Sequence, residues 1–155
     1  QRAINEIYRI LKRGGTYCAF EPIIKSNPRY HELTAPDEIT DWRAFKEAED
    51  DFMSDPNDPL TNFDAQSIAQ NLDLAGFSDG DIDVQDTPSS YVATKEAIKQ
   101  WFDSAPSPDR PTTKERFLKY FDEDKVNNYI FEVQNALHNK MISVNSKTIF
   151  IRATK

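Results

Sequence analysis

Two adjacent glycines, Gly14 and Gly15, separate a helical pattern from a run of apolar residues. Before them, apolar side chains recur at helical spacing, at Ile4, Ile7, Tyr8 and Leu11. A glycine just past the last turn can adopt the left-handed conformation that ends a helix without steric cost. The run that follows, Thr16 to Glu21, is apolar from Tyr17 to Phe20, which is typical of a strand covered on both faces, as in parallel sheets. A helix joined to a buried strand in this way predicts an α/β protein.

Helical patterns with recognisable ends occupy much of the remaining chain. Asp64 is placed to cap a helix that Gly76 ends, and Thr112 and Glu115 have the spacing of a capping box. Further helices are expected over Thr34 to Met53, after Thr94, and again from near Asp124. Their apolar stripes indicate helices that each pack one face against a core.

Extended patterns occur at two further places. Residues Asp81 to Thr87 alternate, which predicts a strand with one wet face. Near the end of the chain, Met141 to Val144 and Thr148 to Ala153 also alternate, on either side of the polar pair Asn145 and Ser146. Two alternating runs around a polar pair predict a hairpin that ends the chain in a strand.

Composition limits the class of protein. The chain has 155 residues, which fits one compact domain, and a net charge of -7, which makes a phosphate backbone a poor partner, so no nucleic acid is expected. No apolar run approaches the ~20 residues that a bilayer span requires, so no membrane association is expected either. Cys18 is the single cysteine and excludes an internal disulfide. We therefore expect a cytoplasmic protein in which Cys18 is a structural thiol buried in its strand.

The segment from Glu6 to Gly15, which reads Glu-Ile-Tyr-Arg-Ile-Leu-Lys-Arg-Gly-Gly, resembles class I S-adenosylmethionine-dependent methyltransferases. In that family a helix ending in Lys-Pro-Gly-Gly precedes the fifth strand of a Rossmann-like sheet, and here Arg13 stands in place of the proline. Ala75-Gly76-Phe77 before an alternating strand resembles the family's helix and sixth strand. Ile149 to Ala153 resembles its closing seventh strand. The three segments occur in family order.

The resemblance implies a partial Rossmann-like methyltransferase sheet, with the seventh strand between the fifth and sixth and antiparallel to both. Residues 1–155 would form a single domain, the C-terminal part of a methyltransferase domain, with residues 88–147 as a helical insertion. The glycine-rich turn and the acidic residue that hold the cofactor have no counterpart here. S-adenosylmethionine is thus expected to bind the parent protein and not this chain, which alone would be an inactive fragment.

The resemblance also implies candidate substrate-binding residues for a small-molecule methyl acceptor. Ligands of open α/β sheets lie beyond the carboxyl ends of the strands, and Glu21 stands at that end of the first strand, where it could orient or deprotonate the acceptor. The alternative for Glu21 is a side chain that only bonds nearby backbone groups or faces solvent. Tyr91, after the alternating strand, could line the same cleft or could be a packing residue. Trp42 and Trp101 could form an aromatic acceptor pocket, with packing in the core as the alternative for each.

Metal binding and association with another chain are the remaining possible functions. His31 and His138 lie far apart in the sequence without a second ligand at helical spacing, so we expect two surface histidines and no metal site. The first strand would lack its usual neighbour on one side, and an uncovered strand edge can pair with another chain. The alternative function is therefore a non-catalytic dimerisation or interaction module derived from a methyltransferase fold, a homodimer formed through that edge.

Overall fold

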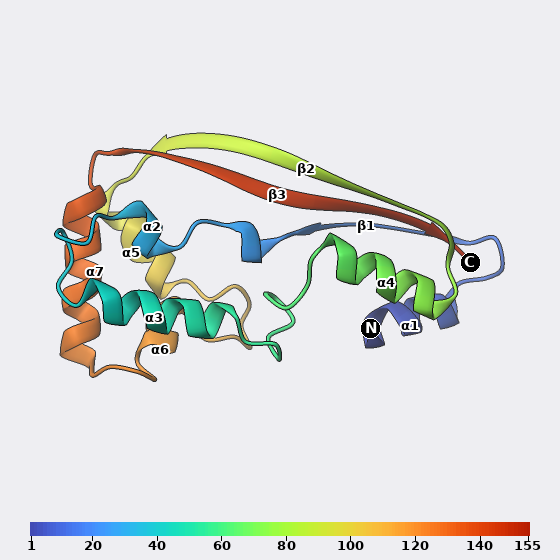
Figure 1. The fold of residues 1–155 in the computed structure, drawn as a ribbon, viewed down its shortest axis with the longest axis horizontal. Helices are drawn as coiled ribbons and strands as arrows, with labels where there is room; N and C mark the ends of the chain where they lie inside the picture. Colours follow the sequence, from blue (N-terminus) through green and yellow to red (C-terminus); the bar gives the residue numbers. More distant parts are fainter. The chain divides into compact units, whose positions relative to one another are not determined.

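The computed structural model describes residues 1–155, and the chain forms two compact units (Figure 1). The first unit contains Gln1–Asn27, Asp55–Pro88 and Asn145–Lys155, and the second contains Pro28–Ser54 and Ser89–Val144. In chain order the elements are α1 Arg2–Ile10, β1 Thr16–Pro22, the 3-10 helix η1 Ile24–Ser26, α2 Tyr30–Leu33, α3 Trp42–Met53, α4 Ala65–Ala75, β2 Ser78–Val92, α5 Lys95–Asp103, α6 Thr113–Phe117, α7 Glu123–Leu137 and β3 Met141–Thr154. No helix is both long enough and apolar enough to span a bilayer.

The sheet has three strands in the order β1-β3-β2. β3, the last strand of the chain, pairs antiparallel with β1 in a register that runs from Thr16 opposite Thr154 to Pro22 opposite Thr148. β2 runs along the other side of β3, where Ser78 donates a hydrogen bond to the Thr154 carbonyl and Asn145 donates one to Asp86. Because β3 is antiparallel to both neighbours, β1 and β2 are parallel to each other. The expected mixed α/β character, strand order and strand directions are confirmed.

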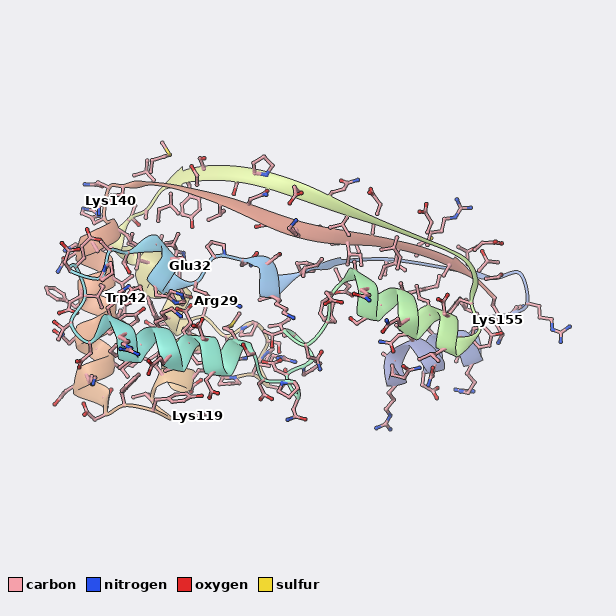
Figure 2. All side chains as sticks on the ribbon, viewed as in Figure 1. Arg29, Glu32, Trp42, Lys119, Lys140 and Lys155 are labelled. Carbon is pink, nitrogen blue, oxygen red and sulfur yellow. The ribbon has the colours of Figure 1, made fainter.

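The turn between α1 and β1 is closed by the end of the chain. Gly14 has a φ of +75°, the left-handed conformation expected of it. Its N–H donates to the carbonyl of Lys155 at 2.7 Å, and the Lys155 N–H donates to Gly15 at 3.0 Å. The Lys155 side chain, labelled in Figure 2, donates to the Tyr8 carbonyl, which is one of the last acceptors of α1. The two glycines thus connect the first helix to the start of β1 and, through Lys155, to the end of β3 beside it.

In the first unit, α1 and α4 pack together and cover one face of the strands (Figure 1). Asp64 and Ser67 form a reciprocal capping box at the start of α4, and Gly76 ends the helix with a φ of +93°. Both ends of this helix were predicted from the sequence and are confirmed. The side chains buried beneath the two helices are Ile23, Ile68, Leu72, Phe77, Ile149, Ile151 and Ala153.

The opposite face of these strands is not covered within the first unit. Residues along β1 alternate between half-buried and exposed, and Phe20 is 68% exposed. The expectation of a strand covered on both faces was therefore wrong, and so was that of a buried thiol, because Cys18 points to the same exposed face as Phe20. The physical reason is that α1 and α4 both pack on the side of Tyr17 and Ala19. Apolar side chains remain on the bare side, where the rings of Phe20 and Phe150 lie 6.3 Å apart.

The second unit is a helical cluster around an aromatic core. Thr94, Thr112 and Asp122 each accept a backbone hydrogen bond as the N-cap of α5, α6 and α7, so the first two caps are confirmed and α7 begins one residue before Asp124. The helix expected from Thr34 begins only at Trp42. The largest side chains that are almost wholly buried there are Tyr129, Phe45, Phe102, Phe117, Ile98 and Leu137.

The hairpin expected at the end of the chain was wrong, because β3 is one continuous strand from Met141 to Thr154. The alternation on the two sides of the polar pair is real but out of phase. In the first part of β3 an even-numbered position, Ile142, is buried. In the last part the odd-numbered positions are buried, namely Ile149, Ile151 and Ala153. Asn145 and Ser146 therefore lie near the point where the buried face of the strand changes, and not in a turn.

Candidate functional site

Glu21 lines a pocket of about 570 Å³ in the first unit. The pocket is bounded by α1, β1, β3, α4 and the loop that precedes α4. Its size falls in the range of small-molecule sites. It holds Glu21 next to the carboxyl end of β1, which is the position where the sequence placed a substrate-binding residue.

The pocket combines an apolar wall with polar groups around it. Ile4, Ile7, Phe63, Ile68 and Ile151 supply the apolar wall. The polar residues include Arg2, Tyr17, Asn71 and Glu21. A few polar groups set in an apolar surface are the arrangement by which proteins orient small ligands.

The negative charge of Glu21 acts on the neighbouring Tyr17 in this pocket. Burial, and after it the charge of Glu21, raises the pKa of the Tyr17 hydroxyl. The Glu21 side chain itself is exposed and forms no hydrogen bond or ion pair. An unpaired carboxylate at a pocket can accept hydrogen bonds, or a proton, from a bound amine or hydroxyl.

Tyr91 lies in the second unit, on β2, and belongs to a cluster of aromatic rings. Its ring meets that of Trp101 edge to face at 6.2 Å, and Trp101 stacks on Tyr30 at 6.2 Å. Tyr30 also donates its hydroxyl to the Trp101 carbonyl at 3.1 Å, and burial raises its pKa to about 12. Tyr91 is 39% exposed, so it forms the accessible end of the cluster. The structure thus brings Tyr91 and Trp101 together.

Trp42 begins α3 (Figure 2) and packs against the core of the second unit. Its ring meets His31 edge to face at 5.8 Å, and its indole N–H is buried without a hydrogen-bond partner. The arrangement favours the packing role over an open acceptor pocket. His31 was expected at the surface, which was wrong, because it is 7% exposed and paired with Glu49.

Glu49 is the centre of a buried polar network that the sequence did not indicate. Its carboxylate accepts the Tyr30 N–H at 2.9 Å, the His31 N–H at 3.4 Å and contacts His31 Nδ1 at 3.0 Å. Burial raises the pKa of Glu49, and these hydrogen bonds oppose the rise. The Tyr129 hydroxyl is buried without a partner, and its pKa is raised by burial and then by the charge of Glu49.

Glu49 and His31 could not be found from sequence spacing, because each one's partner lies eighteen or more positions away. A glutamate on the helix face shared by Trp42, Phe45 and Phe52 was the only available signal. This network joins α2 to α3 and fixes the backbone of Tyr30, whose ring belongs to the aromatic cluster. Glu21 belongs to the first unit, whereas Tyr91 and Trp42 belong to the second.

Comparison with known proteins gives no assignment: no family model and no curated protein matches the chain.

Proposed function

We propose that the chain is the substrate-side portion of a class I S-adenosylmethionine-dependent methyltransferase acting on a small-molecule acceptor. The observation that carries the proposal is the order β1-β3-β2, with a reversed strand between two parallel ones. That is the fifth, seventh and sixth strand order that the sequence resemblance implies. The glycine turn at Gly14 and the helix stop at Gly76 lie at the corresponding points.

The residues of this chain do not fit S-adenosylmethionine itself. A nucleotide cofactor of this fold needs a glycine-rich turn between a strand and the N-terminus of a helix. Gly14 and Gly15 instead lead from a helix into a strand, Gly76 ends α4, and Gly80 lies within β2. We therefore place the cofactor on other residues of the parent protein, where it would supply an electrophilic methyl group.

Glu21 is the residue of this chain that we assign to binding the methyl acceptor. In the pocket of the first unit its carboxylate would hold the amine or hydroxyl of the acceptor and take the proton that this group loses. Positioning of the acceptor is the main contribution expected, because alignment of two reactants can supply much of the rate enhancement of a transfer reaction.

Calorimetric titration with S-adenosylhomocysteine tests the proposal on two proteins, the 155-residue chain and the product of the complete open reading frame that encodes it. We expect binding by the second and none by the first. Micromolar binding by the chain alone would show that it builds a nucleotide site from residues we have excluded. Absence of binding by both proteins would contradict the methyltransferase assignment.

A second candidate function is association through β1, and the contrast between the two edges of the sheet favours it. β2 carries Asp81, Asp83 and Asp86, and such charges protect a strand edge from pairing. β1 pairs on one side only and has no charged residue from Thr16 to Phe20. Antiparallel pairing of two copies of β1 would be self-complementary, as a twofold interface requires.

Light scattering at increasing concentration tests this second function. Pairing through β1 predicts a homodimer that Phe20→Lys converts to a monomer, because the new charge lies on the uncovered strand. Phe131→Lys, at an exposed position of α7, serves as the control and should leave the dimer intact. A monomer at all concentrations would contradict association.

A further inference from the structure

We infer that the pocket of the first unit binds an amphipathic amine, with its ammonium group on Glu21 and its apolar body on the isoleucine wall. The inference extends the proposed function by naming the chemical class of the acceptor. Only the statement that this amine is the methyl acceptor rests on the proposed function, because binding of the amine itself requires no cofactor.

The charged groups of the pocket are not paired with each other. Glu21 and Arg2 both line it, yet the structure has no ion pair between them and neither side chain has another hydrogen-bond partner. Ser67, in contrast, is fully used in the capping box with Asp64. Glu21 is therefore available to a ligand, whereas Ser67 is not.

Glu21 is the better placed of the two charged groups. It belongs to β1, where the backbone is fixed by pairing with β3 opposite Ile149. Arg2 is the first residue of α1, a position at which helices fray, and its long side chain is exposed. A ligand anchor fixed by a strand loses less conformational entropy on binding than a long side chain at a helix end.

The apolar wall selects the body of the ligand. Ile4 and Ile7 come from α1, Ile68 comes from α4 and Ile151 comes from β3, so three elements contribute to one surface. Phe63 adds a ring from the loop. A short alkyl or aromatic group would remove this surface from water, while its ammonium group forms a charge-assisted hydrogen bond with Glu21, which is stronger than a neutral one.

Nuclear magnetic resonance titration of the chain with three matched probes tests the inference. Phenethylamine carries a cation, 2-phenylethanol carries a neutral hydroxyl, and 3-phenylpropanoate carries an anion on a similar body. We expect phenethylamine to bind most tightly and to shift the amide signals of α1, β1 and α4. Glu21→Gln should weaken that binding about tenfold, as expected for loss of one charged hydrogen bond, and leave 2-phenylethanol unaffected.

Two control variants separate this site from general charge effects. Glu6→Gln removes an exposed carboxylate of α1 that pairs with Arg9 outside the pocket, and should leave phenethylamine binding unchanged. Arg2→Gln should leave it unchanged or strengthen it. Equal binding of the alcohol, tighter binding of the anion, insensitivity to Glu21→Gln, or no saturable shift would each overturn the inference. None of these results depends on S-adenosylhomocysteine, so the outcome stands apart from that of the calorimetric test.

Discussion

Replacing Phe45 by alanine lowers the free energy of unfolding of the second unit by about 3–5 kcal/mol, the range found for large-to-small changes at buried aromatic positions. Phe45 is 1% exposed and stacks on Tyr129 with ring centroids 3.9 Å apart. It also touches Phe117 and Phe121. Removal of the ring therefore leaves a cavity among side chains of α6, α7 and the segment between them.

Urea unfolding followed by tryptophan fluorescence measures this effect. Both tryptophans, Trp42 and Trp101, belong to the second unit, so the signal reports that unit alone. Phe131→Ala is the matched control, since this ring is 57% exposed on α7, and it should cost less than about 1 kcal/mol. Equal losses for the two variants would contradict the packing described for Phe45.

Replacing Glu49 by alanine lowers the free energy of unfolding of the same unit by about 3 kcal/mol, because it leaves buried donors without an acceptor. The affected groups are the N–H groups of Tyr30 and His31 and the imidazole of His31. The measurement is again urea unfolding. Glu47→Ala removes an exposed carboxylate that pairs only with Arg43 and should change the value by about 0.5 kcal/mol or less. A similar value for the two variants would show that the buried network contributes nothing.

Glu49 should also make the free energy of unfolding depend on pH, with lower stability at higher pH. Folding raises the pKa of this carboxyl above its ordinary value of 4.5, so the folded chain holds the proton more tightly than the unfolded chain. The part of the stability that comes from holding this proton is thus complete below that value and is lost as the pH rises through the raised pKa, whereas the hydrogen bonds that the carboxyl accepts remain. Stability relative to Glu49→Gln should fall over this interval and be constant above it. A rise with pH would contradict the dominance of burial.

Local signals in the sequence were sufficient for both ends of α4 and for the starts of α5 and α6, but not for the start of α3. Asp64 caps α4 through a neighbour three residues away, and Gly76 ends it through its own backbone conformation. The capping box at Thr112 likewise needs only Glu115. Each of these features depends on residues within one helical turn, so the sequence contains the whole interaction.

Features that depend on distant residues were missed. A buried strand and a strand with one bare face can have the same apolar run, and only the positions of α1 and α4 show that β1 is covered on one side. The polar pair at Asn145 resembled a turn because the change of buried face in β3 depends on which elements pack on each part of it. His31 appeared to be a surface residue until its contact with Glu49 was known.

The pairing of β1 with β3 has a consequence for the order in which the chain can fold. Thr16 faces Thr154, so the two paired strands lie far apart in the sequence, with all the helices of the second unit between them. The helices of the second unit all end by Leu137, before most of β3 has been made. The pairing of β1 with β3 therefore has to wait until the helices of the second unit have been made, and Phe20 and Cys18 are exposed on β1. Because long-range pairing is slow to form, we expect the sheet to be the last and most aggregation-prone part of the molecule to assemble.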